Sequence, residues 1–256
     1  MRIHRYLELI WYKGYADLLA DSSRAYVGLL WWVLEPVLYM GAFYVAFDLI
    51  GLRAGGASPM LFLLCGLVPW KWFASSVQHG SSAIESNSGL LQQVYLPKQV
   101  LPCIVLFTNT IKFSVVLSLL LVLTILLGMG PTLHWLALPL VVLLELLIIL
   151  AVTSLFASLV PFLPELQLVI DNGLMVLMFL SGIFTEIDKL PRKIALILHA
   201  NPMVPIIEAY RSVLLNDSWP DWKALSWVFG LGILIYALAF WILRRNDRAY
   251  LKLMVG

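Results

Sequence analysis

Charged side chains are scarce in this chain: Asp, Glu, Lys and Arg together make up 12% of its 256 residues. No lysine follows a glycine, so the Gly-x-x-x-x-Gly-Lys-Ser/Thr loop of nucleotide hydrolases is missing. The Gly-x-Ser-x-Gly, His-Glu-x-x-His and Cys-x-x-Cys motifs are missing as well. The net charge of +2 is too small to indicate nucleic-acid binding. These absences leave the chain without a recognisable catalytic or ATP-hydrolysing centre of its own.

Cysteine and histidine are also few and scattered. We interpret Cys65 and Cys103 as small buried apolar residues rather than a disulfide or metal site. The four histidines each fall near an expected membrane boundary, where interfacial polar residues are common. Glu186 and Asp188 stand two apart, but Lys189 beside them favours a plain surface cluster. We therefore expect no metal site.

Long apolar stretches fill most of the chain, and hydrophobic residues make up 61% of it. A helix that crosses a bilayer needs about 20 mainly apolar residues. The sequence predicts an all-α polytopic membrane protein, a single transmembrane domain with six transmembrane helices. Spans one to six are expected at 29–52, 59–80, 103–128, 135–160, 166–184 and 222–243. Grouped as segments, the spans occupy 29–80, 103–184 and 222–243, with a loop at 81–101, a mixed segment at 185–221 and a tail at 244–256.

Residues 2–22 form the only clearly amphipathic stretch, with apolar and charged residues on opposite sides of a helix. Its charges make spanning costly, whereas a helix lying in the headgroup region satisfies both faces. The basic residues Arg2, Arg5 and Lys13 would then meet anionic headgroups. The alternative is an ordinary amphipathic helix packed on the rest of the protein.

Orientation follows from the distribution of Lys and Arg near the ends of the spans. More of them lie on the side of the termini than on the other side, and Arg244 and Arg245 directly follow the last span. We therefore expect both termini and 81–101 in the cytoplasm, and 185–221 outside.

Two ionisable residues fall near the middle of the bilayer. Lys112 lies about nine residues into span three and Glu145 about ten residues into span four, and consecutive spans are antiparallel. Buried intramembrane charges usually face protein or water. We expect a structural ion pair between Lys112 and Glu145; the alternative is two separate groups that face an aqueous path.

Aromatic residues gather in the first two spans and have two competing interpretations. One is interface anchoring and helix packing. The other is a channel wall, because sugar rings stack their apolar C–H faces on aromatic rings while their hydroxyls stay hydrated. The candidate channel-lining residues are Trp32, Tyr39, Phe43, Phe47, Trp70, Trp72 and Phe73.

Three blocks resemble the permease subunits of polysaccharide-exporting ABC transporters, which move O-antigen, capsule and teichoic-acid chains. They are SRAYVGLLWWVLEPVLYM (23–40), GLVPWKWF with AIESNSGLLQQVYLPKQVLP (66–73 and 83–102), and LSGIFTEIDKLPRKIALILHANPMVPIIEAYRSVLL (180–215). In the third block, Asn201-Pro202 and Ile207 to Arg211 resemble a family signature. Two departures stand out: Gly182 replaces a common proline, and Pro164-Glu165 replaces an Arg-Asp pair.

The resemblance implies a non-catalytic permease subunit of the bacterial inner membrane with short re-entrant helices in 185–217. It implies a two-fold dimer with a second copy of the chain and two separate ATP-binding cassette subunits, which would bind ATP and Mg. It also implies that 81–101 holds the helix that contacts the ATPase. The candidate coupling residues are Ser86, Asn87, Leu90, Leu91 and Gln92.

The substrate that the resemblance favours is a lipid-linked polysaccharide, O-antigen first, capsular polysaccharide second and teichoic acid third. A membrane enzyme that acts on lipid-linked sugars is a weaker alternative, because no cluster of carboxylates or phosphate-binding residues stands out at one interface. A secondary transporter is weaker too, since it would expect broken helices around a mid-membrane site.

Overall fold

The computed structural model describes residues 2–24, 59–93, 96–247 and 249–250, together with Leu34, Val37, Leu38, Gly41 and Val45. Every regular element in these residues is an α-helix or a 3₁₀-helix, so the predicted all-α class is confirmed. The predicted first span, 29–52, falls mostly outside the described residues.

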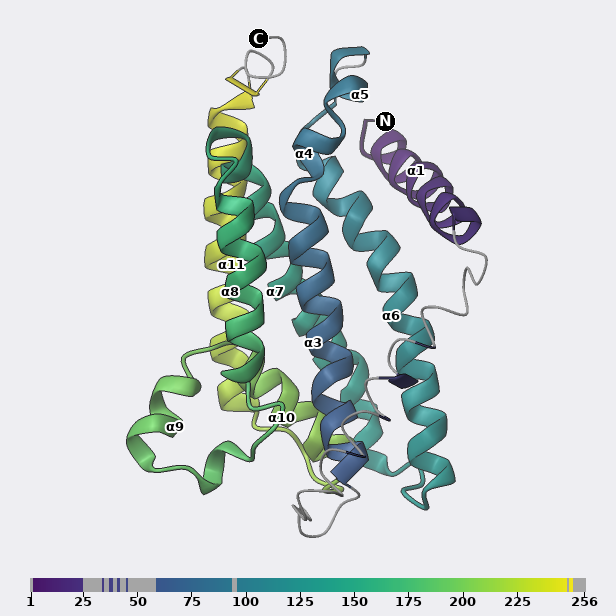
Figure 1. Ribbon diagram of the computed structural model, residues 1–256, viewed down its shortest axis with the longest axis vertical. Helices are drawn as coiled ribbons and strands as arrows, with labels where there is room; N and C mark the ends of the chain where they lie inside the picture. The colour runs from purple at the N-terminus through teal and green to yellow at the C-terminus, as the bar shows by residue number, and fades with distance from the viewer. Residues whose placement is uncertain are drawn as a thin grey trace.

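Four helices of the described chain are long and apolar enough to cross a membrane. They lie side by side along the long axis of the molecule (Figure 1). The shortest of these segments has 23 residues and a length of about 34 Å, against a hydrocarbon core of about 30 Å. The helices are α3 (Pro59–Ser81), α6 (Val100–Leu126), α7 (Leu138–Leu159) with the short helices η1 (Leu133–Ala137) and η2 (Val160–Phe162) at its ends, and α11 (Trp222–Arg245). These elements match predicted spans two, three, four and six.

Helix α6 begins at Val100, three residues before the predicted start of span three. The sequence suggested a start directly after Pro102, because a proline often marks a helix boundary. Proline is tolerated in the first turn of a helix, where its missing N–H would have no intrahelical partner. Pro102 therefore lies inside α6.

The predicted fifth span, 166–184, contains a helix of only 14 residues, α8 (Leu166–Phe179). At 1.5 Å per residue its length is about 21 Å, which is too short to cross the hydrocarbon core by itself. The chain leaves the helix at Phe179 and turns at Gly182, whose φ of 70° lies in the left-handed region. Proline fixes φ near −65°, so this turn could not form with a proline at position 182.

Helix α3 is the most enclosed of the four long helices and forms the centre of the core. It packs against α6, α7, α8 and α10 (Met203–Leu214). Trp72 of α3 stacks on Phe113 of α6 with ring centroids 4.0 Å apart and an interplanar angle of 10°. By contrast, α6 and α11 expose large apolar residues such as Val122 and Leu234, as expected of surfaces that face lipid.

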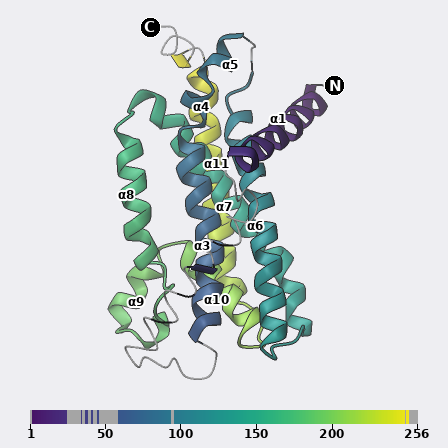
Figure 2. The same ribbon diagram turned by 45° about the vertical axis from the view of Figure 1, so that its right-hand side comes forward.

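The two ends of the helix bundle carry different elements. Helix α1 (Arg2–Arg24), the end of α11, and the short helices α4 (Ala83–Ser86) and α5 (Ser88–Gln93) lie at one end, here called the terminus end (Figures 1 and 2). Helices α9 (Arg192–Leu198) and α10 lie at the opposite end, where α8 finishes and α11 begins. The predicted 185–221 segment thus starts and finishes at one end of the bundle.

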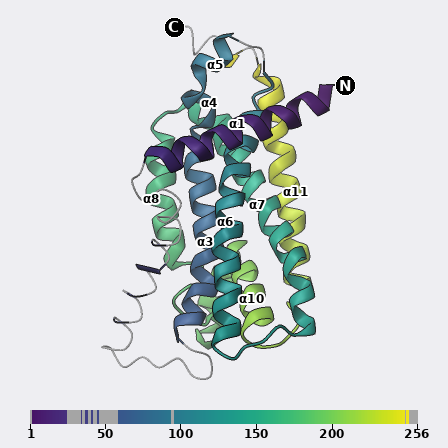
Figure 3. The same ribbon diagram turned by 90° about the vertical axis from the view of Figure 1, so that its right-hand side faces the viewer.

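Helix α1 runs across the long helices rather than along them (Figure 3). Its contact with α6 is close at Gly14, where an added Cβ would lie 2.6 Å from Cδ1 of Phe107. The other side of α1 is uncovered, and Trp11, Tyr12 and Tyr15 are all more than half exposed. Helix α1 therefore packs on the protein through a narrow face and leaves an aromatic-rich face open.

We predict that Gly80→Ala lowers the free energy of unfolding by about 1–2 kcal/mol, because the added methyl overpacks the contact of α3 with α7. A Cβ at position 80 would lie 2.1 Å from Cγ2 of Thr153, and the next nearest atom, Cβ of Thr153, is 3.6 Å away. Thr153→Ser removes Cγ2 and should restore most of the loss. Gly173→Ala on α8, where the added methyl meets open space, is the matched control. Thermal unfolding in detergent measures the effect, and equal melting temperatures for the two glycine variants would contradict the prediction.

Candidate functional site

The candidate coupling segment consists of α4 and α5 at the terminus end. Asn87 joins the two helices: its Nδ2 donates to the carbonyl of Ala83 at 2.8 Å, and its own carbonyl accepts from the amide of Leu91 at 3.1 Å. Just before α4, the Ser81 hydroxyl donates to Oε1 of Gln167 on α8 at 2.7 Å. These hydrogen bonds join α4 to α5 and tie the end of α3, where the segment begins, to α8.

The segment has an exposed polar face and a buried apolar one. Glu85 and Ser86 of α4 and Gly89 and Gln92 of α5 are exposed. Partial burial still raises the pKa of the Glu85 carboxyl above its ordinary value. On the other side, Ala83, Ile84 and Leu91 pack into a buried cluster with Leu96, Leu101, Ile104 and residues of α1 and α11.

The five candidate coupling residues therefore differ in their surroundings. Ser86 and Gln92 are exposed, Asn87 and Leu90 are half-buried, and Leu91 is only 3% exposed. In this arrangement Leu91 anchors the segment to the rest of the chain. The exposed Glu85, which sequence reasoning passed over, shares the outer face with Ser86.

The tail is anchored to the helix bundle by its one aromatic residue. Tyr250 is fully buried, its hydroxyl donates to the carbonyl of Ser158 at 2.8 Å, and its ring lies 5.0 Å from that of Phe162. Burial raises the pKa of the Tyr250 hydroxyl. An aromatic residue that follows a run of charged residues is the sequence signal for this contact.

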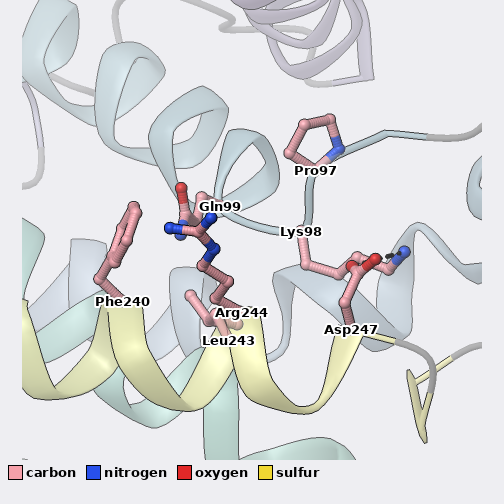
Figure 4. A pocket seen from close by; sticks show the side chains of 7 residues that line it. All are labelled: Pro97, Lys98, Gln99, Phe240, Leu243, Arg244 and Asp247. Atoms are coloured by element: carbon pink, nitrogen blue, oxygen red, sulfur yellow. Dashed lines mark ion pairs between the residues drawn. The ribbon is translucent and has the colours of Figure 1, made fainter.

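A cavity of about 270 Å³ opens at the same end, between the start of α6 and the end of α11 (Figure 4). Lys98 and Asp247 line one side, with 3.2 Å between Nζ and Oδ1. Arg244 and Gln99 extend toward each other across the cavity, in the view that Figure 4 gives. Pro97, Phe240 and Leu243 complete the lining.

At the opposite end, Arg211 of α10 joins three segments of the chain. Its Nη1 donates to the carbonyl of Gly182 and its Nη2 to that of Ile183, both at 2.8 Å. Both Nε and Nη2 also lie 3.3 Å from the carbonyl oxygen of Phe62, whose ring centroid is 3.5 Å from the guanidinium carbon. The side chain thereby fixes the turn after α8 against the start of α3.

Asn201, in the same stretch of sequence, secures the beginning of α10. Its Nδ2 donates to the Ser181 hydroxyl at 2.8 Å, and its Oδ1 accepts from the amide of Met203 at 3.0 Å. Asn201 and Arg211 are both part of the sequence signature noted above. Their contacts show that this signature holds the segment between α8 and α11 in place.

Glu145 is fully buried, and its partner is not Lys112. The Tyr210 hydroxyl donates to Oε2 of Glu145 at 2.7 Å, and Oε1 of Glu145 has no hydrogen-bond partner among the described residues. The predicted Lys112–Glu145 pair is therefore not formed in this structure. The reason is that α10 lies beside α7 and supplies a neutral donor, Tyr210, for which no sequence pattern predicts a pairing with Glu145.

The candidate channel-lining aromatics of α3 lie in the helix core. Trp70, Trp72 and Phe73 are 3%, 2% and 5% exposed, which leaves little ring surface for a substrate. Trp70 and Phe73 contact each other with centroids 5.4 Å apart. The remaining four candidates, Trp32, Tyr39, Phe43 and Phe47, lie outside the described residues.

The basic residues expected to meet headgroups are described only in part. The side chains of Arg2 and Arg5 lie outside the described residues, whereas Nζ of Lys13 is 3.1 Å from Oδ2 of Asp17 on the same helix. Within the described ranges, no group of three His, Cys, Asp or Glu residues could hold a metal ion.

The loop before α11 is held by a contact between distant residues. Nδ1 of His134 lies 2.6 Å from Oδ1 of Asp217, a residue with a φ of 46°. The Thr132 hydroxyl and the His134 ring hold the pKa of the Asp217 carboxyl below its usual range. Asp221 then begins α11 by accepting from the amides of Lys223 and Ala224. The loop at this end is thus defined by polar contacts.

Comparison with known proteins gives one family and a consistent set of relatives. The family model described as "ABC-2 type transporter" matches residues 15–215. The chain is 31% identical over 236 residues to the O-antigen export system permease protein RfbA of Myxococcus xanthus, covering 89% of this chain and 90% of that protein. The protein of the same name from Klebsiella pneumoniae is 25% identical over 239 residues, 93% of this chain and 92% of its own. The polysialic acid transport protein KpsM of Escherichia coli is 28% identical over 237 residues, with 86% and 87% covered.

Proposed function

This chain belongs to the ABC-2 type transporter family, and from that premise we propose that it is the membrane-spanning subunit of an ATP-driven exporter of a lipid-linked polysaccharide. The observation that carries the proposal is the match to export permeases along nearly the whole of both chains. The long apolar helices and the lack of a nucleotide-hydrolysing loop support it.

O-antigen is the proposed substrate, because the relatives with 31% and 25% identity are both named as O-antigen export permeases. Capsular polysaccharide is the second choice, supported by the similarity to a polysialic acid transport protein. Teichoic acid is the third.

The energy would come from two separate ATP-binding cassette subunits that bind ATP and Mg, one for each copy of the chain in a two-fold dimer. The α4–α5 segment is the proposed contact, since it combines an exposed polar face with a firmly packed apolar base. ATP binding by the partner would displace this face, and the buried apolar side chains of the segment would transmit the movement to α3 and α6.

We place the terminus end on the cytoplasmic side of the inner membrane. The positive-inside rule supports this, because Arg244 and Arg245 end the last span there. The open aromatic face of α1 suits the headgroup region, which is the depth that Trp and Tyr prefer. The proposed topology has six spans, with 29–52 as the first, α8 and its flanking residues as the fifth, and α9 and α10 as re-entrant helices.

We predict that Ser86→Arg lowers both recovery of the ATPase subunit on co-purification and polymer export at least ten-fold. A bulky charge on the proposed contact face should cost about 1.4 kcal/mol or more of binding energy, which corresponds to that factor. Asn216→Arg is the matched control, because Asn216 is equally exposed but lies at the opposite end.

Two results would count against these ideas in different ways. Normal ATPase recovery and export with Ser86→Arg would remove the α4–α5 segment from the interface but leave the transport function standing. A wild-type protein that binds no ATPase subunit and transports without ATP would overturn the function itself.

A further inference from the structure

The cavity at the terminus end is lined by both charged and apolar residues, as a binding site for an anion with an apolar tail requires. Its polar groups come from two helices: Lys98 and Gln99 precede the first turn of α6, and Arg244 and Asp247 lie at the end of α11. Phe240 and Leu243 of α11 give it an apolar wall. In Figure 4, the Arg244 guanidinium and the Gln99 amide face each other beside the Phe240 ring.

The charges that line the cavity leave one net positive charge. The Lys98 side chain is only 1% exposed, and its Nζ is 3.2 Å from Oδ1 of Asp247, so these two charges compensate each other. Arg244 is exposed and forms no ion pair within the described part of the chain. Its planar guanidinium can donate two parallel hydrogen bonds to one phosphate group.

The start of α6 contributes a side-chain donor rather than free backbone amides. The amides of Val100 and Leu101 already donate to the carbonyls of Pro97 and Lys98, at 3.0 Å and 3.3 Å, and Pro102 has no N–H. Gln99 makes no capping hydrogen bond with its side chain, so its amide group can donate to an anion beside Arg244.

The surroundings place the cavity at the depth of lipid headgroups. Trp241, one turn before the end of α11, is 54% exposed, and the guanidinium of Arg245 lies 5.1 Å from its ring centroid. Exposed aromatic residues beside Arg at the end of a spanning helix are typical of the membrane interface. Basic pockets between spanning helices at this depth bind anionic headgroups.

We propose that this cavity binds one anionic phospholipid of the surrounding leaflet through its phosphodiester group. Arg244 and the Gln99 amide donate to the phosphate oxygens, and Phe240 and Leu243 pack against the glycerol and the first carbons of the acyl chains. The single net charge matches a phosphodiester, which carries one negative charge, better than a diphosphate, which carries at least two. The inference rests on the proposed function only for its assignment to the cytoplasmic leaflet.

A bound lipid would connect the two helices that meet at the cavity. The start of α6 directly follows the α4–α5 segment, and α11 has extensive contact with α7. Occupancy should therefore stabilise the folded chain, by a free energy that grows as the logarithm of one plus the ratio of free lipid concentration to Kd.

The test compares two neighbouring arginines in purified full-length protein. Arg244→Met and Arg245→Met remove the same charge from the same helical turn, but only Arg244 lines the cavity. Melting temperature in detergent is measured against increasing phosphatidylglycerol, with phosphatidylcholine, polyprenyl diphosphate and inorganic phosphate as the comparison ligands. We expect the melting temperature of the wild type to rise with the logarithm of the phosphatidylglycerol concentration above its apparent Kd, an apparent affinity at least ten-fold weaker in Arg244→Met, and a change under two-fold in Arg245→Met.

Each alternative ligand gives a distinct contrary result. An equal loss of apparent affinity for phosphatidylglycerol in both arginine variants would mean a diffuse electrostatic effect. Stabilisation by phosphatidylcholine to the same extent as by phosphatidylglycerol would remove the anion requirement. Tighter binding of polyprenyl diphosphate would assign the cavity to the substrate headgroup, and tight binding of inorganic phosphate to a soluble anion. If Arg244→Met does not fold, Arg244→Lys replaces it, and unchanged affinity there and in Gln99→Ala would overturn the proposal. None of these measurements needs an ATPase subunit or an export assay, so their failure leaves the proposed function intact.

Discussion

Arg211→Met is expected to lower the free energy of unfolding by about 2–6 kcal/mol and to abolish export. The variant keeps most of the side-chain volume but removes the donors to the carbonyls of Gly182 and Ile183. Each buried carbonyl left without a partner costs about 1–3 kcal/mol. Because Arg211 is only 6% exposed, water has little access to replace the lost hydrogen bonds. Thermal unfolding in detergent and surface polymer are the measurements.

Two further variants define what Arg211 contributes. Arg192→Met, on the exposed surface of α9, removes the same charge and should leave both readouts unchanged. Arg211→Lys keeps the charge but lacks the planar fork that reaches two carbonyls at once, so its loss should be intermediate. If Arg211→Met melted at the temperature of Arg192→Met, the hydrogen bonds to the turn after α8 would contribute nothing to stability.

Tyr210→Phe is expected to cost about 3 kcal/mol, because it leaves a fully buried carboxyl group without its donor. The loss should depend on Glu145. In a Glu145→Met background the same tyrosine replacement should be nearly neutral, since replacing both partners by apolar groups of similar shape removes the unsatisfied group. A double-mutant cycle on melting temperature measures this coupling.

A second double-mutant cycle, on Lys112 and Glu145, tests the pair that the sequence suggested. Lys112→Met combined with Glu145→Gln should give additive losses, because the two residues do not contact each other in the structure. A rescue of Lys112→Met by Glu145→Gln, together with no coupling between Tyr210 and Glu145, would favour an arrangement in which Lys112 meets Glu145.

Much of the fold could be read directly from the sequence. The predicted bounds of spans two, three, four and six lie within three residues of the observed segments, because long apolar runs bounded by Gly and Pro leave few alternatives. The helix in the predicted fifth span ends earlier than expected for a local reason: apolar residues continue to 184, but the left-handed φ at Gly182 belongs to a turn rather than a helix. Hydrophobicity alone does not distinguish apolar residues in a helix from apolar residues in the turn that follows it.

The candidate site was predicted less well. Residues 81–101 were expected on the same side of the membrane as both termini. The described part of this segment lies at the same end of the bundle as α1 and the end of α11, and Ser86 and Gln92 are exposed there. The burial of Leu91 could not be anticipated, because it depends on where α1 and the tail pack. The cavity beside Arg244 was missed for a similar reason, since its residues are about 140 positions apart in sequence.

The sequence by itself determined that this chain lives in lipid as a set of helices, because buried backbone groups in a bilayer must be satisfied within each segment. It also lacks the phosphate-binding loop of nucleotide hydrolases, which is the basis for proposing that a separate subunit supplies the ATP-driven step. Only the tertiary structure decided that Glu145 meets Tyr210, that Arg211 holds the turn after α8, and that the α3 aromatics lie in the core. The physical reason is that helix formation depends on neighbouring residues, whereas the partner of a buried polar group depends on which faces of distant helices pack together.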